Sequence, residues 1–274
     1  MIVWIASYPK SGNTWVRSFL SDYLNKSKTD FNFDILKKIN RFPRKELYDN
    51  LKINYNNFSE IVSNWTNMQT YLNLKDETVY LKTHNAMCTI NGHPFTNKNN
   101  TRGIIYLVRD PRDVILSYSV HLNKNIKDTF QIMTDKFAKG VFKYDGKYIA
   151  DTILGSWSEN YKSWKNFNLK NKIIIKYEDL IQNPYETFFK IINYLNKING
   201  LIIDEEMIKI SIHNTSFNKL QDLEKRGGFN ELDSKNKIFF RKGKSGNWKN
   251  YLDKKIIYQI EQAFKKEMKE LGYL

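Results

Sequence analysis

The residues from Tyr8 to Thr14 have types and a spacing suited to binding a phosphate group. Lys10 supplies a cation, Ser11 and Thr14 supply hydroxyls, and Gly12 permits a tight turn in which backbone N–H groups point into one hollow. A helix that begins directly after such a turn adds the positive end of its dipole. The stretch therefore predicts an anion site, with an ordinary strand-to-helix turn as the alternative.

The position of the lysine distinguishes this loop from the common nucleoside-triphosphatase loop. That pattern ends in Gly-Lys-Ser/Thr, whereas here Lys10 precedes Gly12. The flanking segments predict a strand and a helix: the apolar run 2–6 stops before Pro9, which cannot donate to a strand ladder, and residues 15–20 carry an apolar helical face. The loop therefore joins a strand to a helix.

A lysine and a histidine end the next predicted strand. The β-branched and aromatic run 78–81 leads into Lys82 and His84. Ligands of parallel sheets bind beyond the carboxyl ends of the strands, so both side chains would lie where the Lys10 loop also opens. A histidine there could act as a general base near neutral pH. A purely structural histidine is the alternative.

The run 103–108 predicts a buried strand, and Arg109 follows it. The acid and proline at 110–111 then predict the N-cap and first turn of a helix. Ser117 would lie about two turns along this helix. A guanidinium and a hydroxyl suit a terminal phosphate, and an ion pair between Arg109 and a nearby aspartate is the structural alternative.

The order of these elements predicts an α/β fold: a three-layer, P-loop-type domain with a central, mostly parallel sheet flanked by helices. We interpret residues 1–274 as a single domain. A further strand is predicted at 172–177 and a surface loop at 93–102. Helices are predicted at 151–167, from Asn183-Pro184 onward, after residues 214–217, and at 254–271.

Composition restricts the class of protein. A hydrophobic fraction of 41% is enough for a core, and a net charge of +15 predicts an anionic partner such as a nucleotide, a polyanion, a membrane surface or a nucleic acid. The single cysteine, Cys88, excludes an intrachain disulfide and a cysteine-based zinc cluster. The short N-terminal apolar run lacks a basic leader and no run is long enough to span a membrane, so we expect a cytoplasmic protein.

Residues 8–15 resemble the 5′-phosphosulfate loop of the cytosolic-type sulfotransferases, which use 3′-phosphoadenosine-5′-phosphosulfate (PAPS) as the sulfuryl donor. Lys82-Thr83-His84, the pair Arg109 and Ser117, and residues 241–249 match the same family in the same order. Weaker matches are Tyr177-Glu178-Asp179 and Thr215-Ser216-Phe217. The resemblance covers essentially the whole chain.

The resemblance implies a role for each matched residue. Lys10 would contact the 5′-phosphosulfate and the leaving oxygen, His84 would be the general base, and Lys82 would be a second cation on the transferring group. The donor-binding residues that it implies are Lys10, Ser11, Gly12, Asn13, Thr14, Trp15, Arg109, Ser117, Tyr177, Ser216, Phe217, Arg241, Lys242 and Gly243. Within this set, Trp15 and Phe217 would flank the adenine, and Arg109 and Ser117 would hold the 3′-phosphate with residues 241–243.

The implied reaction moves a sulfuryl group from PAPS to a hydroxyl or amine of a small-molecule, lipid or sugar acceptor, with 3′-phosphoadenosine-5′-phosphate (PAP) as product. No metal and no nucleic-acid partner are expected. One alternative is a P-loop kinase for a small molecule or nucleotide, which would need Gly-Lys-Ser/Thr in the loop. The other is a non-enzymatic polyanion or nucleic-acid binder, suggested by the positive charge.

The sequence departs from the family pattern at several positions. Asn13 and Asn247 stand where better-known members have threonine and aspartate, and both keep a polar side chain. Residues 85–87 replace the Leu-Pro that commonly follows the histidine, so the acceptor pocket is expected to differ. Residues 253–258 do not match the family's dimerisation segment, which leaves the oligomeric state open.

Overall fold

The structure, a computed structural model, describes residues 1–26, 30–75, 77–144, 147–229 and 238–274. The chain contains two compact units. Unit 1 consists of Met1–Tyr8, Ile39–Tyr106 and Met133–Ile174, and unit 2 consists of Pro9–Lys38, Leu107–Ile132 and Ile175–Leu274.

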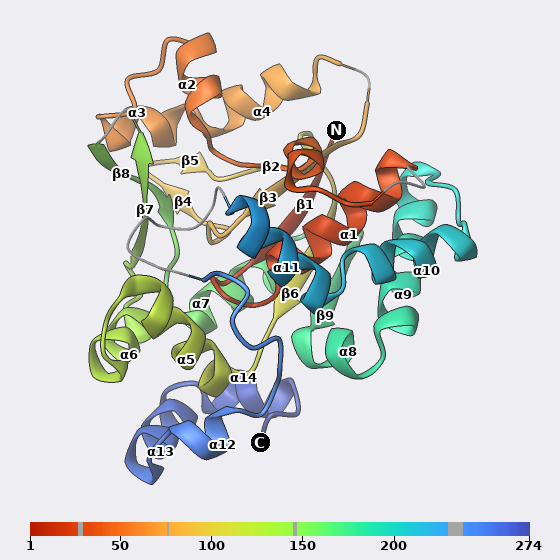
Figure 1. Ribbon diagram of the computed structural model, residues 1–274. Helices are drawn as coiled ribbons and strands as arrows, with labels where there is room; N and C mark the ends of the chain where they lie inside the picture. Colours follow the sequence, from red (N-terminus) through yellow and green to blue (C-terminus); the bar gives the residue numbers. More distant parts are fainter. Residues whose placement is uncertain (27–29, 76, 145–146, 230–237) are drawn as a thin grey trace. The chain divides into compact units, whose positions relative to one another are not determined.

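A parallel sheet of five strands lies at the centre of the fold, in the order β2-β3-β1-β6-β9 (Figure 1). Its strands are β1 Ile2–Ser7, β2 Asn40–Arg41, β3 Val79–Thr83, β6 Thr101–Val108 and β9 Lys172–Lys176. Helices flank this sheet, which confirms the predicted α/β class. Four of the strands match predicted runs, and β2 was not predicted because two residues carry no readable alternation.

Strands β1 and β3 set the position of the predicted catalytic strand end. They pair in parallel from Ile2 opposite Val79 to Ala6 opposite Thr83. Every residue of β1 is buried, as expected for a strand covered on both faces. Ser7 and His84 therefore follow the last register pair at the same end of the two strands.

The remaining elements of unit 1 are short helices and two antiparallel hairpins. They are α2 Lys45–Asn50, α3 Phe58–Ser63, α4 Trp65–Asn73, α7 Trp157–Asn166, the hairpin of β4 Thr89–Ile90 with β5 His93–Pro94, and the hairpin of β7 Lys139–Tyr144 with β8 Lys147–Ile153. The expected loop at 93–102 thus contains β5 and the start of β6. The expected helix at 151–167 starts only at Trp157, because residues 151–153 finish β8 and the Ser156 hydroxyl caps the helix by accepting from the Glu159 N–H (3.1 Å).

Helices make up the described part of unit 2. They are α1 Asn13–Asn25, the 3₁₀ helix η1 Phe33–Lys38, α5 Pro111–Leu122, α8 Tyr177–Gln182, α9 Pro184–Asn199, α10 Glu205–Asn214, α11 Phe217–Gly227, α12 Trp248–Tyr251, α13 Lys254–Ala263 and α14 Lys265–Glu270, while α6 Ile126–Thr134 contains residues of both units. The helix expected at 254–271 is divided at Phe264, whose backbone leaves the helical region (φ −119°, ψ 17°) while its ring stays buried. Within the described ranges, no helix has the length and apolarity needed to cross a membrane.

Candidate functional site

The turn between β1 and α1 has the backbone conformation of an anion-binding loop. Lys10 (φ 66°) and Gly12 (φ 94°) both have left-handed backbone conformations, and Gly12 is the N-cap residue of α1. The helix has no side-chain cap and no acidic residue in its first turn. Neither the N-cap residue nor the first turn of α1 therefore supplies a side-chain oxygen to the positive end of the helix dipole, where an anion would bind.

Ser11 supplies an independent sign that this turn is built for a ligand. Its side chain is fully buried, and its Oγ has no hydrogen-bond partner among the described residues. A buried hydroxyl without a partner costs about 1–3 kcal/mol. A phosphate oxygen in the turn would accept a hydrogen bond from this hydroxyl and remove that cost.

Tyr177, the first residue of α8, packs directly against the turn. A Cβ built on Gly12 would lie 2.6 Å from Cδ2 of Tyr177, so a side chain at position 12 would both clash and occupy a strained backbone conformation. The Arg109 guanidinium lies over the Tyr177 ring, with its central carbon 4.2 Å from the ring centroid. Burial raises the pKa of the Tyr177 phenol, so the ring is neutral at physiological pH.

Arg109 connects the turn to a distant segment of the chain. Its Nη1 donates to the Lys10 carbonyl (3.2 Å) and its Nη2 donates to the Lys244 carbonyl (3.0 Å). The alternative of an ion pair with a neighbouring aspartate is not what the structure shows, because Asp110 forms its ion pair with Arg112 (2.7 Å). Arg109 thus joins the loop to the segment that begins at Arg241.

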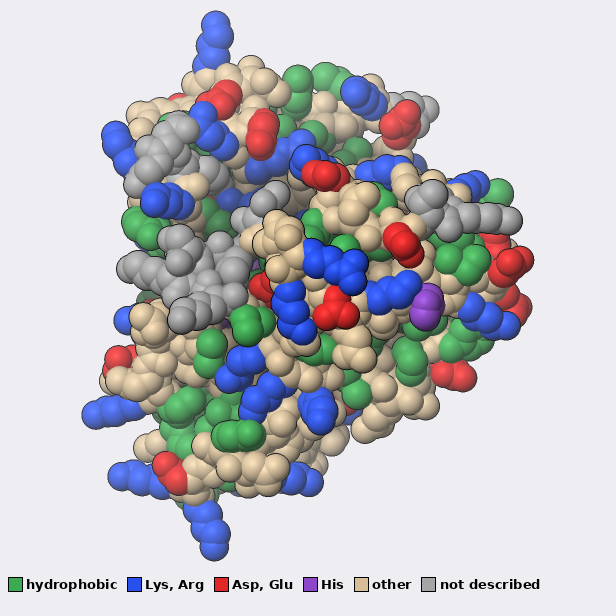
Figure 2. Space-filling model, in the orientation of Figure 1, with side chains coloured by type: hydrophobic (Ala, Val, Ile, Leu, Met, Phe, Trp, Pro, Cys, Tyr) green, Lys and Arg blue, Asp and Glu red, His purple; other side chains and the backbone are tan. Residues whose placement is uncertain are grey.

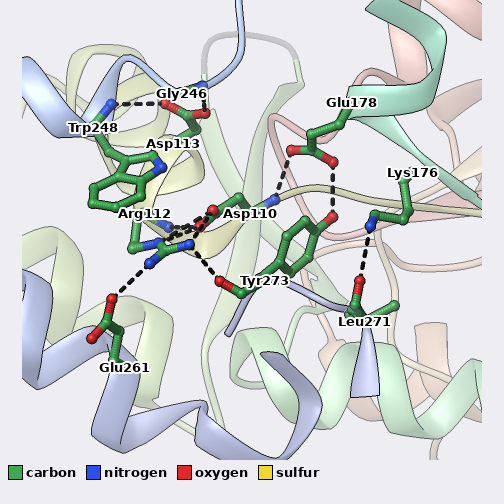
Figure 3. Close-up of polar contacts among 10 residues, drawn as sticks. All are labelled: Asp110, Arg112, Asp113, Lys176, Glu178, Gly246, Trp248, Glu261, Leu271 and Tyr273. Atoms are coloured by element: carbon green, nitrogen blue, oxygen red, sulfur yellow. Dashed lines mark hydrogen bonds and ion pairs between the residues drawn. The ribbon is translucent and has the colours of Figure 1, made fainter. Parts of the chain in front are cut away.

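Asp113 fixes the same segment from the first turn of α5. Its carboxylate accepts from the backbone N–H groups of Gly246 (2.6 Å) and Trp248 (3.1 Å), as drawn in Figure 3. Burial raises the pKa of Asp113, although Arg109 and these two N–H donors act in the opposite direction. The sequence analysis did not identify this role, since an acid in the first turn of a helix is ordinarily explained by the helix dipole.

Arg112, at the start of α5 after strand β6, forms a second set of polar contacts with the C-terminal part of the chain. Arg112 donates to Asp110, to Glu261 on α13 (2.6 Å) and to the Tyr273 carbonyl (2.8 Å), and its guanidinium lies over the Trp248 ring (3.8 Å to the centroid) (Figure 3). Such a buried, multiply paired arginine fixes the orientation of its partners. The predicted N-cap is confirmed, because Asp110 also accepts from the Arg112 N–H (2.9 Å).

The residues predicted for the 3′-phosphate come close together on α5 and the 241–243 segment. Arg241 donates to the carbonyl of Leu116, the residue before Ser117 (3.3 Å). Lys242 lies over the Tyr251 ring (3.5 Å to the centroid). Gly243 has a left-handed backbone (φ 58°), and a Cβ there would collide with the Phe217 ring. The backbone of the 241–243 segment therefore packs directly against the Phe217 ring.

The residues predicted for the adenine share one aromatic cluster. Trp15 and Phe217 both pack against buried side chains that include Phe229 and Phe240, and Trp15 makes edge-on contacts with Tyr177 and Phe188. Phe239 also packs against this cluster, and the Lys10 ammonium lies 4.0 Å from its ring centroid. The contact with Phe239 was not predicted, because nothing in the sequence distinguishes it from other aromatic residues.

Lys82 and His84 lie at the end of β3 in unit 1. Lys82 is buried and pairs in register with Ile5 of β1 and Arg41 of β2. The Nδ1 atom of His84 lies 2.8 Å from the Ser7 carbonyl oxygen and 3.1 Å from the Ser7 hydroxyl. A carbonyl oxygen can only accept, so Nδ1 carries a proton in this arrangement and the lone pair of the neutral imidazole is on Nε2.

The predicted site residues thus form two groups, each within its own unit. The group in unit 2 contains Lys10, Ser11, Gly12, Asn13, Thr14, Trp15, Arg109, Ser117, Tyr177, Ser216, Phe217, Arg241, Lys242 and Gly243. The group in unit 1 contains Lys82 and His84. The first has the chemistry of a nucleotide-phosphate site, and the second has that of a base beside a cation.

Comparison with known proteins identifies the family of the chain. The sulfotransferase domain family matches residues 2–272. The chain belongs to the sulfotransferase family. Similar proteins include the flavonol 3-sulfotransferase of Flaveria bidentis, 26% identical in an alignment of 290 positions that covers 98% of this chain and 82% of the relative. The dog sulfotransferase 1B1 is 28% identical in an alignment of 279 positions that covers 96% of this chain and 82% of the relative.

Solved structures show the same fold. A retinol dehydratase in complex with androsterone and the inactive cofactor PAP has a TM-score of 0.62 and 22% identity, covering 98% of this sulfotransferase and 80% of that chain. The mouse sulfotransferase SULT7A1 complexed with PAP has a TM-score of 0.60 and 21% identity, covering 98% and 84%. Membership of the family makes this protein an enzyme of sulfuryl transfer and sets aside the kinase and the non-enzymatic binder.

Proposed function

We propose that the enzyme transfers a sulfuryl group from PAPS to a hydroxyl group of a small organic molecule, with His84 as general base and Lys10 and Lys82 as cations on the transferring group. The observation that carries the proposal is the turn before α1, where a helix N-terminus without a side-chain cap and the buried Ser11 hydroxyl are both suited to binding an anion. The 5′-phosphosulfate group of PAPS is such an anion.

The other residues of unit 2 fit the rest of the donor. Trp15 and Phe217 present aromatic faces that suit the adenine, and both pack on the same cluster. Ser117 and Arg241, which lie on adjoining segments, suit the 3′-phosphate together with Lys242 and Arg109. A plain 5′-nucleotide would leave this second basic group without an anion.

The residues at the end of β3 suit the acceptor half of the reaction. Nε2 of His84 would take the proton from the acceptor hydroxyl while the acceptor oxygen bonds to sulfur and the bond from sulfur to the 5′-phosphate oxygen breaks. By analogy with phosphoryl transfer, negative charge develops on the leaving oxygen in a loose transition state. Lys10 and Lys82 would stabilise that charge electrostatically.

The proposed acceptor is a small molecule with a hydroxyl group. Relatives of this chain are named for flavonol and luciferin sulfation, and solved relatives of the fold contain androsterone or retinol. We also propose that the enzyme is cytoplasmic, and two relatives from Arabidopsis thaliana are named cytosolic sulfotransferases. Lys and Arg side chains are spread over the face shown in Figure 2, with Asp and Glu side chains among them.

Calorimetric titration with PAP and with AMP tests the donor site. We expect PAP to bind at least tenfold more tightly than AMP, because only PAP carries a 3′-phosphate for Arg241 and Ser117. Arg241→Ala should remove most of this preference. Arg241 is exposed, so its loss should leave the fold intact.

Lys249→Ala is the matched control for that experiment, since Lys249 is an exposed cation on α12, close in sequence to the 241–243 segment. It should bind PAP as the wild type does. Equal and weak binding of PAP and AMP to the wild type would contradict the proposed donor.

Gly12→Ala should weaken PAP binding by about 10–100-fold. The added methyl group would lie 2.6 Å from the Tyr177 ring, so the turn must move and its N–H groups would lose their alignment. Calorimetry would measure the affinity, and thermal unfolding would measure the stability.

Gly200→Ala is the control that separates the effect on PAP binding from the effect on stability. Gly200 follows α9 with a left-handed backbone (φ 74°), and a Cβ there meets nothing within 4 Å. It should lower stability through backbone strain alone and keep full PAP affinity. If Gly12→Ala bound PAP as tightly as Gly200→Ala, the turn would not be the donor site.

A further inference from the structure

A closed ring of hydrogen bonds within unit 1 joins His84 to the Ser7–Tyr8 peptide, Tyr106 and Asn160. The His84 Nδ1–H donates to the carbonyl of the Ser7–Tyr8 peptide (2.8 Å). The N–H of the same peptide donates to the Tyr106 hydroxyl. That hydroxyl donates to Oδ1 of Asn160 (2.8 Å), and Nδ2 of Asn160 donates back to the His84 carbonyl (3.0 Å).

The direction of each bond in this ring follows from chemistry. The Ser7 and His84 carbonyl oxygens can only accept, and the Tyr8 backbone nitrogen can only donate. The Tyr106 hydroxyl therefore accepts from Tyr8 and donates to Asn160, which leaves the amide of Asn160 in a single orientation. A reversed amide or a reversed hydroxyl would break bonds on both sides.

The two side chains that complete the ring are buried. Asn160 is fully buried and Tyr106 is 2% exposed, so water cannot substitute for a lost partner. Burial raises the pKa of the Tyr106 phenol well above its ordinary value, so it keeps the proton that it donates to Asn160. Asn160 also donates to the Leu154 carbonyl (2.8 Å), which anchors it to the segment before α7.

Neighbouring side chains of α7 hold the residues that follow His84. Trp164 donates to the Asn85 carbonyl (2.8 Å), and the Ser163 hydroxyl accepts from the Met87 N–H (2.9 Å). Asn160, Ser163 and Trp164 lie on one face of the helix, at a spacing of three and four residues. This face of α7 thus forms hydrogen bonds with the backbone of His84, Asn85 and Met87.

We propose that Tyr106 and Asn160 are positioning residues for sulfuryl transfer, which hold His84 with its proton on Nδ1 and its lone pair on Nε2. The inference rests on the proposed role of His84 as the base. Neither residue is placed against a substrate, and both act through the Ser7–Tyr8 peptide and the His84 carbonyl.

The first test is the tautomer of His84 in the wild-type protein, measured by ¹⁵N NMR of the imidazole nitrogens. The chain has four histidines, and the spectrum of His84→Gln identifies the His84 signals. We expect the neutral ring to carry its proton on Nδ1. A neutral ring with its proton on Nε2 would overturn the proposal without reference to any activity.

The second test is Tyr106→Phe, which removes one hydroxyl and keeps the ring of the side chain. We expect a mixture of His84 tautomers and a fall in kcat of about 10–100-fold, with the KM for PAPS and the Kd for PAP unchanged. Asn160→Asp, which still accepts from Tyr106 but cannot donate to His84, should act in the same direction. Folding of both variants is checked by thermal unfolding and by PAP binding.

Tyr161→Phe is the matched control, because Tyr161 is as buried as Tyr106 and lies outside the ring of hydrogen bonds. The centroids of the two aromatic rings are 5.9 Å apart. It should keep the wild-type tautomer and kcat. If Tyr106→Phe also kept both, the ring would have only a structural role and the proposal would be wrong. If the wild type bound PAP but sulfated no hydroxyl acceptor, the proposed function would fail, while the tautomer measurement would still decide whether the ring holds His84.

Discussion

His84→Gln should reduce kcat for sulfuryl transfer by about 10²–10⁴-fold and leave PAP affinity unchanged. Glutamine keeps a polar side chain of similar size but cannot take a proton from the acceptor hydroxyl. The Nδ1 contact with the Ser7 carbonyl places the accepting lone pair on Nε2, which is the arrangement that a base requires. Initial rates over a range of pH, with a small phenolic acceptor, would measure the loss.

His93→Gln provides the control for that variant. His93 is an exposed residue of β5 in the same unit, so its replacement should leave kcat unchanged. We expect the pH dependence of kcat near neutrality to disappear in His84→Gln and to persist in His93→Gln. Retention of both kcat and its pH dependence in His84→Gln would show that another group acts as the base.

Lys10→Met should lower kcat by about 10²–10³-fold, comparable to the loss of one donor from an oxyanion hole. Methionine fills the space of the lysine stem and can still pack on Phe239, whose ring lies 4.0 Å from the Lys10 ammonium. What it lacks is the charge that would face the leaving oxygen. Steady-state kinetics with saturating PAPS would measure this difference.

Lys26→Met is the matched control, because Lys26 also has a left-handed backbone (φ 49°) and follows the opposite end of α1. It should leave kcat unchanged. A Lys10→Met variant that raised the KM for PAPS without lowering kcat would assign Lys10 to binding of the ground state and not to stabilisation of the transition state.

Local signals in the sequence were enough to predict the frame of the site. The strands β1, β3, β6 and β9 each contain a short apolar run, and the acid-proline pair at 110–111 marked the start of α5. Such signals depend on neighbouring residues alone. The antiparallel pair of β7 and β8 was not predicted, because both strands are of mixed polarity and show no clear alternation of apolar and polar residues.

The motif residues proposed for the site are visible in the sequence, but the groups that orient them are not. Lys10, His84 and Arg109 each end a strand or follow a turn, which is visible in the sequence. Tyr106 lies within an apolar strand and is indistinguishable there from a core residue, and Asn160 lies on a helix for which the sequence predicted no site residue. Their role depends on strand register and on the contact of α7 with the end of β3.

The attachment of the 241–248 segment to α5 also determines when the donor site can form during folding. Asp113 binds the backbone of Gly246 and Trp248 across 133 and 135 positions of the chain, and Arg109 reaches Lys244 across 135. Contacts of such high sequence separation form after local structure, because a long loop must first be closed. A chain emerging from the ribosome therefore cannot assemble the proposed 3′-phosphate site until residues 244–248 have been synthesised.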